Sequence, residues 1–93
     1  MTEETIKRRL FRAKRDAIKA LEGVQYDVIP ADNSNFCVVA TRNQEVRLIR
    51  IVIDRVTEND VDLIKDWQHP GNCTKEIWCR EHGQKYFEIR KII

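Results

Sequence analysis

The stretch 45–53 constrains the fold more than any other part of this sequence. Apolar residues occupy both faces of an extended chain here, with Ile49, Ile51 and Ile53 on one face and Val46, Leu48 and Val52 on the other. Successive side chains of a strand point to opposite sides of a sheet, so both sides of this strand need cover from solvent. The sequence therefore predicts a central strand with a packed layer against each face.

The segments around this strand predict one α/β (α+β) domain over residues 1–93. An amphipathic helix over 2–22 comes first, because apolar residues recur there at helical spacing, and Gly23 is expected to end it. A second helix begins after the cap residue Thr57. The expected strands are 26–30, 36–41, 45–53, 74–80 and 85–92. The order α-β-β-β-α-β-β predicts a mixed central sheet flanked by helices.

Composition places the domain among globular chains. Apolar residues make up 42% and charged residues 34% of the chain, and no apolar run is long enough to span a bilayer. Three cysteines do not form the disulfide framework of a small secreted domain, and no signal-peptide pattern follows the charged N-terminus. We therefore expect a cytoplasmic protein without membrane contact and, because so short a chain has a modest core, a homodimer.

Three short phrases carry a family resemblance, namely Ser34-Asn35-Phe36-Cys37, Ile49-Arg50-Ile51-Val52 and Lys75-Glu76-Ile77-Trp78. In order, they resemble the entry to the second strand, the third strand and the strand after the crossover helix in the PD-(D/E)XK nuclease superfamily. Its members include restriction endonucleases and archaeal Holliday-junction resolvases. In these families a helix precedes a three-strand meander, a second helix and a further strand or hairpin. The resemblance implies a restriction-endonuclease-like fold over nearly the whole chain.

The catalytic residues of that superfamily are absent at the matching positions. Cys37 replaces the metal-binding Asp, Arg50 the Glu, and Val52 the Lys. A thiol, a guanidinium and an isopropyl group do not supply the carboxylate oxygens that Mg²⁺ prefers. The resemblance therefore implies a degenerate active site, for which we expect no catalytic residue, no metal and no cofactor.

One face of the first helix carries a row of four cations, Arg8, Arg12, Arg15 and Lys19. Their spacing of i, i+4, i+7 and i+11 places them together, opposite the apolar stripe. Such a row suits a phosphate backbone and predicts weak, sequence-independent binding of nucleic acid. The same face is where any soluble helix keeps its charges, and a net charge of +2 adds no argument for nucleic acid. Both interpretations stay open.

Four residues of zinc-ligand type lie close together in the sequence: His69, Cys73, Cys79 and His82. Six residues of strand separate the two cysteines by about 20 Å, whereas the ligands of one zinc ion lie about 4 Å apart. We therefore expect no zinc site. Cys37 and Cys79 are expected to be small core residues.

Two further residues have both a structural and a functional interpretation. Arg50 lies on an apolar strand face, so it either binds an anion or pairs with an acid such as Asp27, Glu76 or Glu88, and the ion pair is favoured. Trp78 is either covered by a helix or exposed at an interface.

The leading hypothesis is a non-catalytic module that associates with nucleic acid or with an assembly. A second hypothesis is a metal-dependent nuclease whose acids have moved to the strand edges, where candidates are Asp27, Asp32, Glu45 and Asp54. It requires at least two of these carboxylates to converge near a lysine. A third hypothesis is a protein-interaction module with an apolar patch around Trp78.

Overall fold

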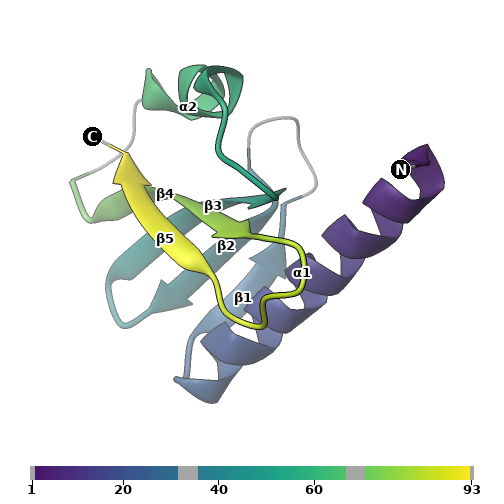
Figure 1. Cartoon of the computed structure of the whole chain (residues 1–93). Coiled ribbons are helices and arrows are strands. Elements are labelled where there is room, and N and C mark those ends of the chain that lie inside the picture. The colour runs from purple at the N-terminus through teal and green to yellow at the C-terminus, as the bar shows by residue number, and fades with distance from the viewer. Residues whose placement is uncertain (1, 32–35, 67–70, 93) are drawn as a thin grey trace.

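The computed structural model describes residues 2–31, 36–66 and 71–92 and has the predicted order of elements (Figure 1). Its described elements are α1 (Glu3–Gly23), β1 (Asp27–Pro30), β2 (Val38–Arg42), β3 (Glu45–Ile53), α2 (Glu58–Lys65), β4 (Cys73–Arg80) and β5 (Glu88–Ile92). The fold class is therefore α+β, with two helices and a five-stranded sheet in the described part of the chain.

The strands form one mixed sheet in the order β1-β2-β3-β4-β5. The first three strands are an antiparallel meander, β4 runs parallel to β3, and β5 runs antiparallel to β4. A parallel pair needs a crossover connection, which contains α2 here. The central position of β3 confirms the prediction from its two apolar faces.

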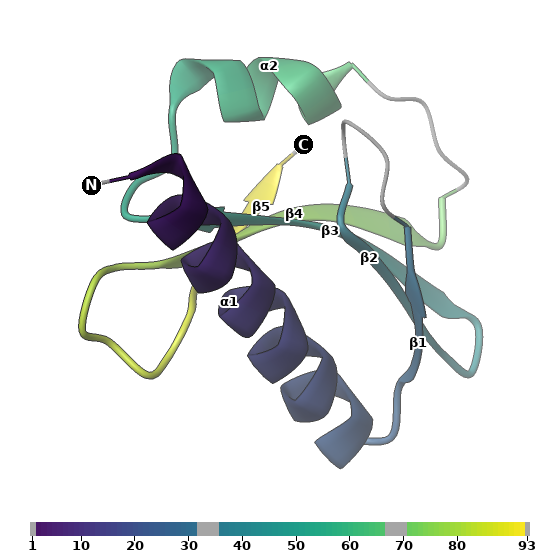
Figure 2. The same cartoon turned by 90° about the vertical axis from the view of Figure 1, so that its right-hand side faces the viewer.

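The helices cover opposite faces of the sheet, which makes three layers (Figure 2). Under α1 lies a core of Ala13, Ala17, Leu21, Tyr26, Val38, Ala40, Ile49, Ile51 and Trp78. Under α2 lies a smaller core of Phe36, Val52, Ile64, Ile77 and Cys79. Successive residues of β3 and β4 enter alternate cores, as the pleat of a strand requires.

The first helix begins at Glu3, one residue after its predicted start, and ends one residue later than expected. The Thr2 side chain accepts a hydrogen bond from the Thr5 amide, which satisfies one free N–H of the first turn. At the other end Gly23 still belongs to the helix, and Gln25 is the residue in the left-handed region, with φ of 70°. Neither described helix is long and apolar enough to cross a membrane.

The third strand matches its predicted range, and the other strands differ from theirs at one or both ends. The largest difference is at β5, which begins at Glu88 and not at Lys85. Residues 85–87 belong to the connection, because Arg80 Nη2 donates to the Lys85 carbonyl at 2.9 Å and the Phe87 ring packs on Trp78. These contacts keep residues 85–87 out of the last strand.

Two ion pairs fasten α1 to the C-terminal ends of β3 and β4. Arg9 donates two hydrogen bonds to Asp54, and Arg80 Nη1 donates to Asp16 Oδ2 at 2.7 Å. These contacts hold the pKa of both carboxyl groups below the ordinary Asp value. Together with the burial of Leu21, which stabilises the fold by about 1.5–3 kcal/mol, they fix the orientation of α1 on the sheet.

The second helix begins with a capping box, as predicted at Thr57. The Thr57 hydroxyl accepts from the Asp60 amide, and the Asp60 carboxylate accepts from the Thr57 amide. The same carboxylate accepts from Arg50 Nε at 3.1 Å. The spacing of Val61, Ile64 and Trp67 predicts the buried face of this helix; Ile64 is buried, and Trp67 lies outside the described residues.

Candidate nucleic-acid interface

The four cations predicted on one helical face form an exposed row along α1. Arg8, Arg12, Arg15 and Lys19 are all exposed, whereas Ala13 and Ala17 on the other side of the helix are fully buried. The row is displayed to solvent because the small alanines hold the opposite side of α1 against the sheet. Its members therefore remain available to a ligand.

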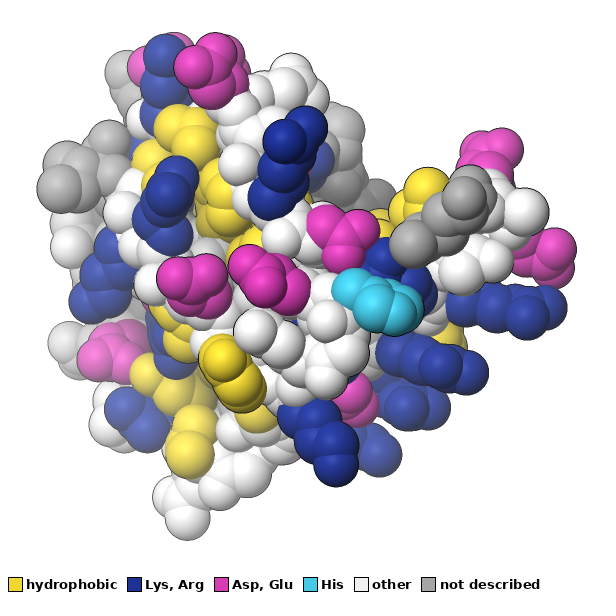
Figure 3. Space-filling view, viewed as in Figure 1, with side chains coloured by type: hydrophobic (Ala, Val, Ile, Leu, Met, Phe, Trp, Pro, Cys, Tyr) yellow, Lys and Arg dark blue, Asp and Glu magenta, His cyan; other side chains and the backbone are white. Residues whose placement is uncertain are grey.

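Further residues extend this face beyond the predicted row. Lys7 is exposed beside it, Lys14 is half-buried, and Phe11 is 67% exposed. In the space-filling view, Lys and Arg side chains gather over α1 (Figure 3). We call the seven residues the α1 basic face: Lys7, Arg8, Phe11, Arg12, Lys14, Arg15 and Lys19.

Carboxylates neutralise only part of this charge. Arg8 forms an ion pair with Glu4 at 3.3 Å, and Arg15 Nε lies 3.7 Å from Asp16 Oδ1. Asp16 makes its shorter contact with Arg80. Exposed pairs of this kind contribute about 0–1 kcal/mol. Within the described part of the chain, Arg12 and Lys19 take part in no ion pair.

Of the three degenerate-site positions, Arg50 and Val52 face α2 from neighbouring places on β3, whereas Cys37 packs on the α1 side of the sheet. Cys37 is half-buried and packs against the core under α1, with its thiol 3.9 Å from the Ile51 carbonyl oxygen. Arg50 bonds to Asp60 of α2, and Val52 belongs to the core under α2. Arg50 thus forms an ion pair, as predicted, but its partner is Asp60 and not one of the three acids expected from the sequence.

Two of the carboxylates proposed for a relocated metal site, Glu45 and Asp54, lie at opposite ends of β3. Glu45 begins β3 and accepts a hydrogen bond from the Tyr26 hydroxyl, while Asp54 follows the other end of the strand and is held by Arg9. Asp27 begins β1, and Asp32 lies outside the described residues. Eight residue steps of strand separate Glu45 from Ile53 by about 27 Å, so Glu45 and Asp54 do not converge.

The residues considered for zinc are likewise spread along β4. Cys73 begins this strand and Cys79 lies near its end, as the strand prediction required. Burial raises the pKa of the Cys79 thiol, which favours the neutral form. His69 lies outside the described residues. The described residues contain no group of three or more His, Cys, Asp or Glu side chains placed to hold a metal ion.

A depression of about 340 Å³ lies at the C-terminal ends of the parallel strands β3 and β4. Its lining contains acids, arginines and uncharged side chains: Asp54, Arg55, Val56, Cys79, Glu81, Glu88, Ile89 and Arg90. Since Arg9 already holds Asp54, and Arg55 and Arg90 lie among the remaining acids, the mixture favours neither a cation nor an anion.

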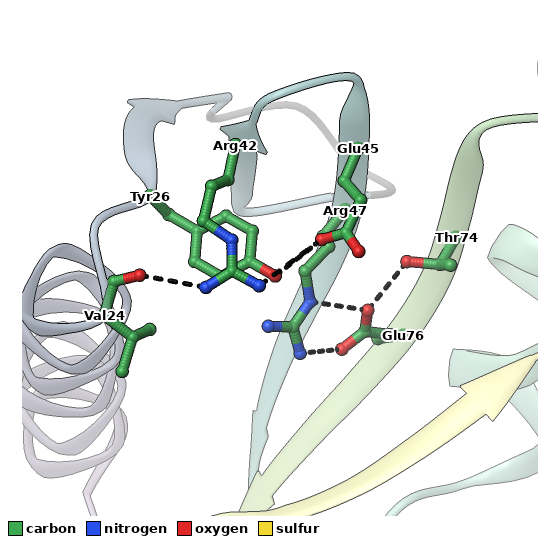
Figure 4. A network of polar contacts seen from close by, with 7 residues as sticks. All are labelled: Val24, Tyr26, Arg42, Glu45, Arg47, Thr74 and Glu76. Carbon is green, nitrogen blue, oxygen red and sulfur yellow. Dashed lines mark hydrogen bonds and ion pairs between the residues drawn. The ribbon is translucent and has the colours of Figure 1, made fainter.

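A buried ion pair between Arg47 and Glu76 is the polar feature that sequence reasoning missed (Figure 4). Arg47 Nε donates to Glu76 Oε2 at 2.8 Å and Arg47 Nη2 donates to Oε1 at 2.5 Å. The Thr74 hydroxyl and the Trp78 indole N–H also donate to this carboxylate. Burial raises the pKa of Glu76, but these bonds outweigh it and leave the pKa below its ordinary value.

The Arg47 guanidinium also lies against two aromatic rings, 5.3 Å from the centre of Tyr26 and 5.4 Å from that of Trp78. The Arg42 guanidinium lies 4.3 Å from the centre of the Tyr26 ring and donates to the Val24 carbonyl oxygen. Because each charge here has internal partners, the cluster serves to lock the end of α1 onto the sheet.

Trp78 belongs to this core and not to an interface. Its side chain is 5% exposed and packs under α1, with the Phe87 ring centre 5.3 Å away. Trp78 itself therefore does not supply the exposed apolar surface that a pure interaction module would need there. The exposed aromatic side chains in the described part of the chain include Phe11, on the α1 basic face, and Tyr86.

No protein-family model, no curated protein and no solved structure matches this chain.

Proposed function

We propose that this protein is a non-catalytic module that binds nucleic acid through the α1 basic face, on a degenerate nuclease-like fold of the PD-(D/E)XK type. The observation that carries the proposal is the exposed row of Arg8, Arg12, Arg15 and Lys19. Helical spacing sets neighbouring cations of this row about 4.5–6 Å apart along α1, and each DNA strand carries one phosphate per about 3.4 Å of duplex axis. Binding of this kind is electrostatic and independent of sequence.

The arrangement of the elements supports the nuclease-like part of the proposal. A helix precedes a three-strand meander, and a second helix leads to β4 and the β4–β5 hairpin. This is the order that the family resemblance implies. The inward packing of Cys37 and Val52 and the ion pair of Arg50 support a site that has lost its chemistry.

Binding of duplex DNA should weaken with salt in proportion to the phosphates that the row contacts. Four contacts correspond to a slope of log K against log [salt] near −3.6, at about −0.9 per contact. Arg12→Gln with Arg15→Gln should reduce the steepness by about 1.8 on the same relation. The measurement is a fluorescence titration of labelled duplex at several salt concentrations.

The matched control removes the same charge from another part of the surface. Arg55 and Arg90 are exposed and lie outside α1, so Arg55→Gln with Arg90→Gln should leave the slope at its wild-type value. An equal loss of slope in both double variants would show that net charge, and not the α1 basic face, drives binding. Absence of salt-sensitive binding in the wild type would refute the proposed function.

No cleavage of DNA is expected with Mg²⁺ or Mn²⁺, because Arg9 holds Asp54 and Glu45 lies at the other end of β3. The assay incubates the purified protein with single-stranded, duplex and branched DNA. Cleavage that disappears in Glu45→Gln or Asp54→Asn would favour the nuclease hypothesis over the binding module.

A further inference from the structure

Phe11 is an apolar ring held in solvent on the polar side of α1. It is 67% exposed, and it lines two shallow depressions of 450 and 440 Å³. Arg15 lines both depressions as well. One of the two continues past Ile18 to Pro30 at the edge strand β1. Phe11 therefore borders two open depressions on the surface of α1.

Cations surround this ring because of helical spacing. Lys7, Arg8, Lys14 and Arg15 are displaced from Phe11 by three or four positions, which makes them its neighbours on the helix surface. Arg12 follows it directly and lines the first depression. An apolar protein partner would have to remove water from these cations on binding, which costs free energy. A polyanion with flat apolar groups can stack on the ring and pair with the cations at the same time.

We propose that Phe11 stacks on an unpaired base of single-stranded nucleic acid while the flanking cations hold the adjoining phosphates. The inference rests on the proposed function and specifies its substrate class. Every base has a π face, so such stacking is tolerant of sequence. In a duplex the bases are stacked on one another, and a ring on a helix surface reaches only the backbone. The module therefore prefers single strands, or the unpaired part of a junction, over uninterrupted duplex.

The test measures binding of a labelled oligo(dT) strand of about 20 nucleotides, an abasic strand of equal length and a duplex, each at low salt. Wild type should bind oligo(dT) more tightly than the abasic strand. Phe11→Ala should weaken oligo(dT) binding between about fivefold and about a hundredfold, the usual effect of losing one stacked base. It should leave the abasic strand unaffected, and Phe11→Trp should restore the preference. An oligo(U) arm shows whether RNA binds in the same way.

Tyr86 provides the matched control, because its ring is 66% exposed and lines neither depression. Tyr86→Ala should bind every strand as the wild type does. Equal binding of oligo(dT) and the abasic strand, both unchanged by Phe11→Ala, would overturn the stacking proposal and leave the proposed function standing. Failure of all three probes to bind would overturn both.

A second copy of this chain is the competing occupant of the Phe11 surface. Sedimentation of the wild type and of Phe11→Ala distinguishes it from nucleic acid. A dimer lost in Phe11→Ala, with oligo(dT) binding unchanged, would assign the ring to self-association and overturn the proposal.

Discussion

Arg47→Met should lower the free energy of unfolding by about 3 kcal/mol, because it leaves the buried Glu76 carboxylate without its cation. Glu76 is 1% exposed, so water does not replace the lost partner. The expected effect lies at the lower end of the range for broken buried pairs, since the Arg47 side chain is 21% exposed and Thr74 and Trp78 still donate to the carboxylate. The urea midpoint at neutral pH measures the change.

Two further variants separate the ion pair from the packing around it. Arg47→Met with Glu76→Gln removes both charges, and it should recover much of the lost stability because no buried charge remains. Arg42→Met provides a matched control: Arg42 also lies over Tyr26, but it is more exposed, so the loss should stay within about 1 kcal/mol. If Arg47→Met unfolds at the wild-type midpoint, the pair contributes nothing to stability.

The architecture around β3 was predictable because one pattern required it. A nine-residue stretch that is apolar on both faces has a single stable position, inside a sheet with layers on both sides. The apolar pattern does not determine the register of β4 against β3. Ile49 is paired with Glu76 and Ile51 with Trp78, and this alignment depends on how α2 crosses the sheet. The Arg47–Glu76 pair follows from that register and was therefore missed.

The partner of Arg50 was missed for a related reason. The sequence indicated that a charge on an apolar strand face needs an acid, and it offered acids from strands as candidates. The observed partner, Asp60, belongs to the capping box of α2. Its capping role was predictable from Thr57, but its position above β3 depends on tertiary packing. One carboxylate thus serves both the helix start and the buried guanidinium.

The candidate interface was predictable only in part. Helical spacing identified Arg8, Arg12, Arg15 and Lys19, since any residues at i, i+4, i+7 and i+11 share a face. Phe11 falls outside both that row and the apolar stripe, and this exception to the pattern was the available signal. The structure adds its exposure and the two depressions that it lines.

Acid should unfold this domain, because several carboxylates that hold its elements together have lowered pKa values in the folded state. Hydrogen bonds from Arg80 and Arg9 lower the pKa of Asp16 and Asp54. Burial raises the pKa of Asp60 and Glu76, but their hydrogen bonds outweigh burial and the net direction is downward. All four carboxylates join separate elements, so their protonation loosens α1, α2 and the sheet together.

The sign of the pH dependence follows from proton binding. As pH falls below the ordinary values of 3.8 for Asp and 4.5 for Glu, the unfolded chain binds protons that the folded chain does not. The stabilisation is complete above these values and is lost as pH falls through the lower folded-state pKa values. The urea midpoint should therefore decline from about pH 4.5 downward. Arg47→Met with Glu76→Gln should decline less steeply, because it lacks one of the four groups. A midpoint unchanged between about pH 5 and pH 3 would mean that these carboxylates are not paired in the folded protein.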